Sequence, residues 1–237
     1  MRRNVMVIAI MALLIASASY GADEAQAPQE QPAPEAQAVQ QAPKEQPEDM
    51  YVAQGVELGK KGMYDEALKV LDEALSINPN SFTAYHYRAT VWAYKGDLDK
   101  AIADWDASIA IDDKQYLSHY SRGLALYRKG EIEKAIADWD RSIELNPHYM
   151  DTYFQRASAK YNKKDYDGAI ADFETLLEAD TANAGKYHYS MAVIYSVKKD
   201  YDKSWEHMHE IEKLGQTQAP EYQQFLKILK KESGRDY

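Results

Sequence analysis

The sequence predicts an all-α fold, a solenoid of antiparallel helix pairs. Two observations lead to this prediction: an internal repeat, and apolar residues at helical spacing within each copy. A ten-residue stretch occurs as KAIADWDASI at 100–109 and as KAIADWDRSI at 134–143, 34 residues later. A third copy at 168–177 and a weaker fourth at 66–75 keep that spacing. Repeats of this length are supersecondary units that stack on their neighbours.

Each repeat is predicted to hold two helices joined by a tight turn. In the second repeat Tyr85, Ala89 and Trp92 recur at the spacing of one helix face. Gly96 suits the left-handed end of that helix, and Asp97 can cap the next one. The apolar stripe of the next helix is Leu98, Ala101, Ile102, Trp105 and Ile109. A turn this short makes the two helices antiparallel.

The ends of the repeats and the small residues inside them are also periodic. Asn-Pro pairs at 78–79 and 146–147 close two repeats. Because the residue before proline avoids the α region, we expect helices to end near Ile77 and Leu145. The periodic small residues are Gly55, Ala89, Gly123 and Ala157 in the first helices and Ala67, Ala101, Ala135 and Ala169 in the second. They predict close approach of the paired helices.

These patterns resemble those of the tetratricopeptide repeat (TPR) proteins, of an exported bacterial type. The family motif of small, glycine, aromatic, bulky and proline positions is matched by Gly55, Gly62, Tyr64, Ala67, Leu71, Ala74 and Pro79. The resemblance covers about residues 48–214. It implies a right-handed superhelix of helix pairs whose concave face binds peptides or proteins.

The predicted TPR solenoid spans residues 50–233. Its repeats are placed at about 48–81, 82–115, 116–149, 150–183 and 185–217, the last after a one-residue insertion. Lys164 stands where earlier repeats have glycine, so its turn should be costlier or differently built. A final helix at 220–233 carries the apolar stripe Tyr222, Phe225, Leu226 and Leu229. We expect it to cap the solenoid.

Residues 1–22 have the three parts of a secretory signal peptide: Arg2 and Arg3, an apolar run at 5–16, and small residues before a cleavage point after Ala18 or Gly21. The apolar run is shorter than the roughly 20 residues that cross a bilayer. The sequence therefore predicts export, to the periplasm, with no membrane span after cleavage. An uncleaved anchor is the alternative.

Residues 23–49 consist mainly of Ala, Gln, Pro and Glu, and their net charge is −6. Val39 is the one sizeable apolar side chain among them, so burial cannot offset the entropy cost of ordering. We predict a disordered, semi-stiff linker. A proline-rich ligand for an aromatic groove is the alternative.

The composition excludes several functional classes. The chain has a formal net charge of −10, which argues against nucleic acid and anionic membrane surfaces as partners. It has no cysteine, so disulfides, thiolate metal sites and cysteine nucleophiles are excluded. No catalytic motif, phosphate-binding loop or metal-ligand spacing occurs. The prediction is a non-enzyme without cofactor or metal; an undetected hydrolase or sugar-binding activity is a remote alternative.

The candidate binding residues form two ladders along the first helices, at places that line the concave groove of the resembled family. The chain's 19 tyrosines supply much of this surface, with broad contact area and a polar tip. The predicted partner-binding residues are His86, Tyr94, Tyr120, Tyr127, Arg128, Phe154, Tyr161, Asn162 and Tyr189. The alternative is that many of these rings pack between helices.

Arginine and aspartate also recur in step, which predicts Arg–Asp pairs between the two helices of a repeat. They are Arg88, Arg122 and Arg156 with Asp104, Asp138 and Asp172. The alternative is a cationic strip that grips a ligand carboxylate.

The functional prediction is a scaffold that binds a protein or peptide partner on its concave aromatic face. A second hypothesis is an envelope-complex component that binds through its convex face or C-terminal helix. The partner and the oligomeric state stay open.

Overall fold

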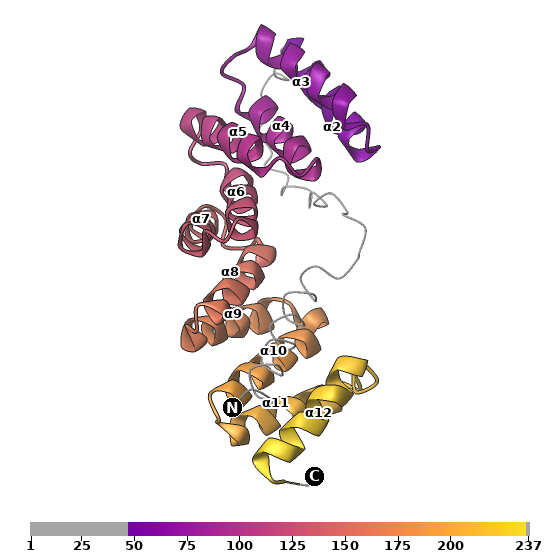
Figure 1. The fold of residues 1–237 in the computed structure, drawn as a ribbon, viewed down its shortest axis with the longest axis vertical. Helices are drawn as coiled ribbons and strands as arrows, with labels where there is room; N and C mark the ends of the chain where they lie inside the picture. The colour runs from indigo at the N-terminus through magenta and orange to yellow at the C-terminus, as the bar shows by residue number, and fades with distance from the viewer. Residues whose placement is uncertain (1–46, 236–237) are drawn as a thin grey trace, which may run out of the picture. The chain divides into compact units, whose positions relative to one another are not determined.

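The computed structural model describes residues 47–235, so the predicted leader and nearly all of the predicted linker lie outside it. Within this range the chain forms α-helices and one 3₁₀ turn, with no strand (Figure 1). The helices are α2 (Pro47–Lys60), α3 (Tyr64–Ile77), α4 (Phe82–Tyr94), α5 (Leu98–Ile111), α6 (Tyr116–Arg128), α7 (Ile132–Leu145), α8 (Met150–Asn162), α9 (Tyr166–Ala179), α10 (Ala184–Val197), α11 (Tyr201–Lys213) and α12 (Pro220–Ser233).

The helices pack as consecutive pairs, α2 with α3 and so on to α10 with α11. Residues 47–145 form one compact body and residues 146–235 another, called here the N-terminal and C-terminal bodies. In the N-terminal body α3 packs on α4, and α5 packs on α6. In the C-terminal body α9 packs on α10, and α12 contacts both α10 and α11. The predicted fold class, an all-α solenoid of helix pairs with a C-terminal capping helix, is confirmed.

α2 begins inside the predicted linker, at Pro47. Proline suits the first position of a helix, and Glu48 and Asp49 are acidic residues in the first turn, where the helix dipole favours them. Glu48 is also buried, and its carboxylate accepts a 2.5 Å hydrogen bond from the Asn78 side chain. The linker prediction was therefore wrong for its last three residues.

The turns inside the repeats are built as the sequence predicts. Gly96 has a φ of 85°, and the Asp97 N–H donates to the Trp92 carbonyl at 3.0 Å, which closes α4. The Asp97 carboxylate then accepts a bond from the Lys100 N–H at the start of α5. α3 and α7 end at Ile77 and Leu145, at the residue before each Asn-Pro pair. These ends confirm the prediction from proline.

The turns of the last two repeats keep the same geometry without glycine. Lys164 and Lys199 have φ values of 65° and 62°, the left-handed region that Gly62, Gly96 and Gly130 occupy in earlier repeats. The closing hydrogen bonds are the same: Asp165 N–H donates to the Lys160 carbonyl, and Asp200 N–H to the Tyr195 carbonyl, each at 2.9 Å. The Lys164 turn is therefore costlier rather than differently built.

The core is a series of contacts between a small residue of a first helix and a bulky residue of its partner helix. A Cβ added at Gly55 would lie 2.6 Å from Cγ of Leu71, and one at Gly123 would lie 2.6 Å from Nε1 of Trp139. Leu71 and Trp139 are fully buried. In these two repeats the paired helices are thus held so close that glycine fits and a methyl side chain would clash.

Trp105 and Trp139 occupy the same repeat position with one difference. Both rings are buried, but Trp139 Nε1 donates to the Tyr120 carbonyl at 3.2 Å, whereas Trp105 Nε1 has no partner among residues 47–235. The matching acceptor for Trp105 is the His86 carbonyl, which already accepts a bond from the Thr90 hydroxyl.

α12 covers the end of the C-terminal body, as predicted. Tyr222, Phe225 and Leu229 are at most 3% exposed. Phe225 packs edge-on against Tyr189 of α10, with ring centres 5.7 Å apart. The apolar side of α12 is therefore already occupied.

Among residues 47–235 no helix has the length and apolar character that a membrane span requires.

Glycine at position 164 or 199 should stabilise the protein. Each lysine holds a left-handed backbone that costs a non-glycine residue about 1 kcal/mol. We expect Lys164→Gly and Lys199→Gly each to raise the free energy of unfolding by about 0.5–1 kcal/mol in urea denaturation. Lys163→Gly is the control, because Lys163 has a right-handed φ of −77° and no strain to release. A loss of stability in both test variants would contradict the strain argument.

Candidate partner-binding faces

In the N-terminal body the exposed predicted residues lie on α4 and α6, two first helices that contact each other. Tyr94 is 45% exposed at the end of α4, and its ring stacks on that of Tyr64 with centres 5.9 Å apart and planes 4° apart. Tyr120 and Tyr127 are partly exposed and lie seven residues apart on α6, which places them on one face. Arg128 is exposed at the end of α6. These four residues form the aromatic face of the N-terminal body.

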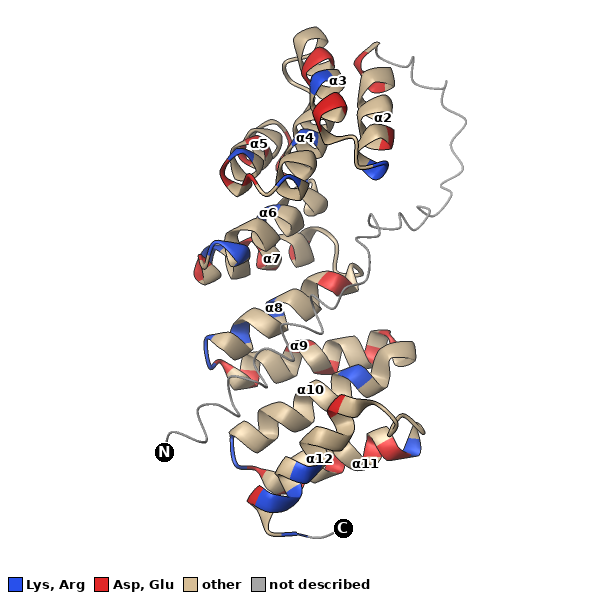
Figure 2. Ribbon diagram, turned by 45° about the vertical axis from the view of Figure 1, so that its right-hand side comes forward, with Lys and Arg blue, Asp and Glu red and all other residues tan. Residues whose placement is uncertain are grey.

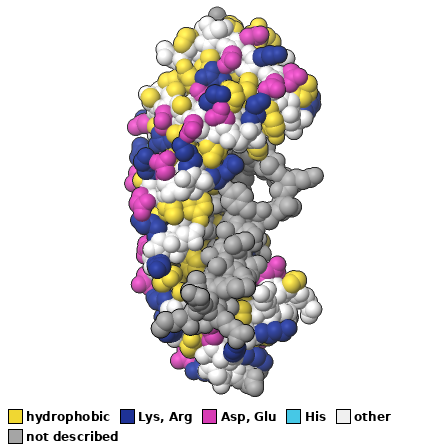
Figure 3. Space-filling model, in the orientation of Figure 1, with side chains coloured by type: hydrophobic (Ala, Val, Ile, Leu, Met, Phe, Trp, Pro, Cys, Tyr) yellow, Lys and Arg dark blue, Asp and Glu magenta, His cyan; other side chains and the backbone are white. Residues whose placement is uncertain are grey.

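The rings of the aromatic face are supported from beneath. The Tyr127 ring centre is 5.8 Å from that of the buried Trp139. Burial raises the pKa of Tyr94, with a further contribution from Tyr64, so its hydroxyl stays protonated at neutral pH. The rings of Tyr94 and Tyr127 are therefore held in place by aromatic contacts, and the Tyr94 hydroxyl is neutral. In Figure 3 hydrophobic side chains are interspersed with charged ones over the surface formed by α2 to α5.

His86 is partly buried, and its ring is held by hydrogen bonds within the N-terminal body. Its Nδ1 lies 2.9 Å from Oγ of Ser118, which lies 3.0 Å from Oγ of Ser108. Burial lowers the pKa of His86 to about 4, so the ring is neutral at pH 7. Ser118 is fully buried, so this serine–histidine contact offers no accessible nucleophile. It is a structural hydrogen-bond network between α4, α5 and α6.

In the C-terminal body two predicted residues are core residues. Phe154 is 7% exposed, packs edge-on against Phe173 at 5.8 Å, and is covered by the ammonium group of Lys186 at 3.8 Å from the ring centre. Tyr161 is 5% exposed and packs against Tyr166. Burial raises the pKa of Tyr161 to about 12. Neither ring offers much surface to a partner. For Phe154 and Tyr161 the structure therefore agrees with the alternative that these rings pack between helices.

The other two residues predicted in the C-terminal body differ in exposure. Asn162 is exposed at the end of α8, whereas Tyr189 is partly buried against Phe225. Burial raises the pKa of Tyr189 to about 12. The nine predicted residues are thus divided between two bodies, and the coherent exposed group among them is the aromatic face on α4 and α6.

The residue that supports the aromatic face at Tyr94 was not predicted. Tyr64 begins α3, a second helix, whereas the search for binding residues followed the first helices only. Its signal was present, because Tyr64 is the aromatic residue of the Gly-x-aromatic motif, which places it beside the end of the next first helix. A search of the second-helix starts would have found it.

The predicted Arg–Asp pairs are confirmed in three repeats. Each arginine donates two hydrogen bonds to the aspartate 16 residues later. The pairs are Arg88–Asp104 (2.7 and 2.7 Å), Arg122–Asp138 (2.8 and 2.6 Å) and Arg156–Asp172 (3.0 and 2.6 Å). The guanidinium groups are occupied by the protein's own carboxylates, so they do not form an open strip for a ligand carboxylate.

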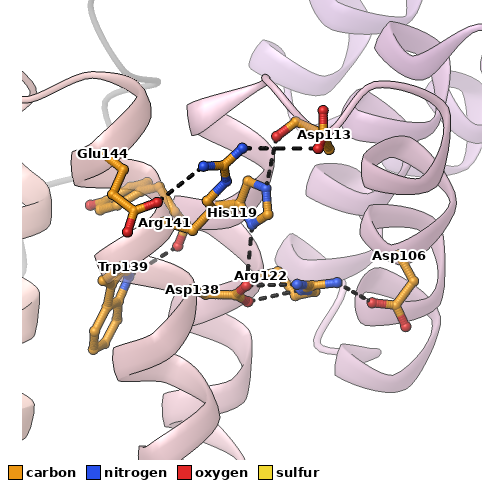
Figure 4. A network of polar contacts seen from close by, with 9 residues as sticks. Asp106, Asp113, His119, Arg122, Asp138, Trp139, Arg141 and Glu144 are labelled. Atoms are coloured by element: carbon orange, nitrogen blue, oxygen red, sulfur yellow. Dashed lines mark hydrogen bonds and ion pairs between the residues drawn. The ribbon is translucent and has the colours of Figure 1, made fainter.

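Two of these arginines also join successive repeats. Arg88 Nη1 lies 2.6 Å from Asp72 of α3, and Arg122 Nη1 lies 2.6 Å from Asp106 of α5. Figure 4 shows Arg122 between Asp138 and Asp106. Burial of Asp138 opposes its ionisation, but hydrogen bonds from Arg122 and His119 outweigh burial and lower the pKa of its carboxyl. The charge network therefore stays ionised at neutral pH.

A histidine pair joins α10 and α11 in the C-terminal body. Nδ1 of His188 lies 2.9 Å from Nδ1 of His207, whose ring stacks on Tyr195. Burial, then the charge of His188, lowers the pKa of His207 to about 4. No group of three or more metal-ligating side chains is placed to hold an ion within residues 47–235. The pair is a hydrogen-bonded contact between neutral rings.

Breaking an Arg–Asp pair should cost stability. Arg122→Ala leaves the carboxylate of Asp138, which is 6% exposed, without its main partner. We expect a loss of about 2–4 kcal/mol in the free energy of unfolding. Arg128→Ala is the control, because Arg128 is exposed on the same helix, and we expect a change within about 0.5 kcal/mol. Equal effects of the two variants in thermal or urea unfolding would refute a special role for the pair.

Stability should fall between pH 7 and pH 5. His86 and His207 have pKa values near 4 in the folded protein, against about 6.5 when unfolded. The unfolded chain then binds more protons in this window, so each histidine should lower the free energy of unfolding by roughly 1–2 kcal/mol at pH 5. His86→Gln and His207→Gln should each flatten the pH dependence of urea midpoints. A wild-type midpoint independent of pH would contradict the burial argument.

Comparisons with known proteins agree with the geometry. Family models of the tetratricopeptide repeat match residues 52–116, 116–149 and 151–183, which together make up more than half of the chain. The chain is a tetratricopeptide repeat protein. A comparison of the sequence with curated protein sequences found no match.

Several solved TPR structures share the fold. A structure of MamA, residues 41 to the end, from Desulfovibrio magneticus RS-1 has a TM-score of 0.64 and 18% identity, over 72% of this chain and 96% of that one. Another crystal structure of MamA has a TM-score of 0.61 and 22% identity, over 65% and 89%. YrrB, described as a TPR protein with an unusual peptide-binding site, has a TM-score of 0.61 and 22% identity, over 68% and 84%.

Proposed function

We propose that this TPR protein is a non-catalytic scaffold of the cell envelope that binds an extended peptide or a protein segment on its aromatic face. The observation that carries the proposal is the aromatic face itself, where Tyr94, Tyr120 and Tyr127 present partly exposed rings from two adjoining first helices. Tyrosine provides large contact area and a hydrogen-bonding tip at low entropy cost, and it is enriched among residues that dominate binding energy.

The support beneath this face favours rigid binding. Tyr94 stacks on Tyr64, Tyr127 rests on Trp139, and Arg122 ties α6 to both α5 and α7. A surface that is already ordered loses little conformational entropy when a ligand binds. YrrB, a protein of this fold, is described as having a peptide-binding site, which supports the same use of the fold here.

The envelope location is proposed from the sequence. Residues 1–22 carry the features of a secretory signal, and the chain from Ala22 onward contains no cysteine that would require an oxidising or reducing compartment. Fractionation of cells that produce the full chain, with detection of a product shortened after Ala18 or Gly21, tests this proposal. A full-length cytoplasmic product would contradict it.

A second candidate function is assembly of an envelope complex through α12. Its apolar side packs against the C-terminal body, and its outer side exposes Lys227 and Lys231. Charge reversal of Lys227, Lys230 and Lys231 separates the two functions. Loss of partner capture in this variant, with capture unchanged by substitutions in the aromatic face, would favour α12.

Alanine substitutions in the aromatic face should weaken partner capture. A partner is first identified by crosslinking in intact cells and mass spectrometry. We then expect Tyr94→Ala, Tyr120→Ala and Tyr127→Ala together to weaken its binding at least about 30-fold, since hot-spot tyrosines contribute about 1–2 kcal/mol or more each. Phe154 is left unchanged because it is a core residue.

Tyr201→Ala is the matched control, because Tyr201 is a partly exposed tyrosine of α11 in the other body. Circular dichroism must show that the triple variant keeps its helix content. A folded triple variant that binds the captured partner as tightly as the wild type would rule out the aromatic face as the binding site.

A further inference from the structure

We propose that the aromatic face selects an extended peptide that carries two acidic residues about six positions apart, with an apolar residue between them. This inference rests on the proposed function and names the chemistry of its ligand. The residues that carry it are Lys60, Tyr94 and Arg128, called here the helix-end row, because they are the last residues of α2, α4 and α6. Figure 2 shows basic residues at the end of α2.

The repeat places the three residues of the helix-end row side by side. They follow one another at intervals of 34 residues, so they occupy equivalent positions of three successive repeats. α2 contacts α4, and α4 contacts α6. A Cβ added at Gly59, next to Lys60, would lie 3.5 Å from Cγ2 of Val91 on α4. Lys60 and Arg128 are exposed, and they flank Tyr94, which is 45% exposed.

The two cations of the row have no acidic partner. Lys60 and Arg128 make no ion pair with any residue of the range 47–235, and all other arginines of that range do. A shortage of acids is not the reason, since the N-terminal body has 18 acidic and 12 basic residues between 47 and 145. A guanidinium group left open in a body with surplus carboxylates is available to a carboxylate from a ligand.

The lysines that follow the row by one residue provide the contrast. Each of them is paired with an acid of its own helix or of the preceding second helix. The pairs are Lys61–Glu57, Lys95–Asp65 and Lys129–Asp99. The repeat therefore neutralises its cations at one position and leaves them open at the position before it.

The remaining acids near these helix ends do not neutralise the row. Those in the turns are paired with lysines of the following helices, as Asp97–Lys100 and Glu131–Lys134. Glu66 makes no ion pair within the described range, but it lies two residues after Tyr64, about 200° around α3. Because Tyr64 is on the side of α3 that stacks on Tyr94, Glu66 faces away from the row.

The row sets the spacing of the charges on the ligand. Packed helices lie about 8–10 Å apart, so Lys60 and Arg128, two helices apart, are separated by roughly 20 Å. An extended chain rises about 3.3 Å per residue, so carboxylates about six residues apart reach both cations. Tyr94 lies between them and offers ring surface to an apolar side chain. Arg128 can hold a carboxylate by two parallel hydrogen bonds, so we expect it to contribute more than Lys60.

A displayed library of random dodecapeptides, selected on the full chain, tests this specificity. We expect the enriched sequences to carry Asp or Glu at two positions about six apart, with an apolar residue between them. Selection on Arg128→Gln should lose the acidic preference at one of these positions, and selection on Lys60→Gln at the other. Enrichment of basic peptides, or of peptides with no acidic preference, would overturn the proposal.

A synthetic peptide of the enriched sequence then measures each contact by fluorescence anisotropy. Arg128→Gln should weaken its binding at least about tenfold and Lys60→Gln at least about threefold, with smaller effects at physiological than at low salt. Lys61→Gln and Lys129→Gln are the matched controls, because these lysines are neighbours of the row that already have acidic partners. We expect both controls to bind within about twofold of the wild type.

An exchange of charges shows whether the contact with Arg128 is direct. Lysine in place of the peptide's acidic residue that Arg128 selects should weaken binding to the wild type at least about tenfold. Arg128→Glu should restore the binding of this altered peptide to within about fivefold of the original pair. A merely structural role of Arg128 predicts no such rescue, and its absence would count against the proposal.

The outcomes separate this inference from the proposed function. A selected peptide can lose binding in the triple variant of Tyr94, Tyr120 and Tyr127 and yet bind the Lys60 and Arg128 variants as tightly as the wild type. That result would overturn the acidic specificity and leave the aromatic face as the binding site. A library that yields no peptide dependent on the three tyrosines would contradict both.

Discussion

The closeness of the two helices in each repeat depends on one residue whose side chain is a hydrogen or a methyl group. At Gly123 there is no room for a Cβ, because Nε1 of Trp139 would lie 2.6 Å from it. At Gly55 the side chain of Leu71 fills the corresponding space. Ala89 and Ala157 take this place in the second and fourth repeats, and both are fully buried. The bulky partner can be Leu, Trp or Phe because the small residue leaves the space that it needs.

This close approach sets the geometry of the polar contacts above it. Arg122 lies one residue before Gly123, and Asp138 lies one residue before Trp139, so the ion pair is built on the same turn of each helix as the apolar contact. The two-pronged bond forms only when these turns face each other at short range. Since Arg122 also reaches Asp106 of the preceding repeat, the spacing within one repeat is passed on to the next. The position of the aromatic face follows from this chain of contacts.

Much of this could be predicted from sequence because the repeat supplies four independent examples of each position. The helix ends at Ile77 and Leu145, the cap at Asp97 and the Arg–Asp pairs all follow from local rules applied at a fixed spacing. Burial of Phe154 and Tyr161 could not be predicted in this way. Phe154 is covered by Lys186, which does not belong to the regular 34-residue pattern. The exposure of the Phe154 ring therefore depends on Lys186 and not only on the position of Phe154 in its repeat.

Equivalent positions also differ when neighbours compete for one partner. Trp139 reaches the Tyr120 carbonyl because Leu124, next to it on α6, has no hydroxyl group. In the preceding repeat Thr90 replaces leucine, and its hydroxyl donates to the His86 carbonyl that Trp105 would need. The 34-residue period identifies which residues meet, but the chemistry of a third residue decides which hydrogen bond forms.

The same reasoning applies to the turns inside the repeats, where glycine and lysine hold one backbone geometry. Glycine holds it without strain, and lysine adds a charge at a cost of about 1 kcal/mol.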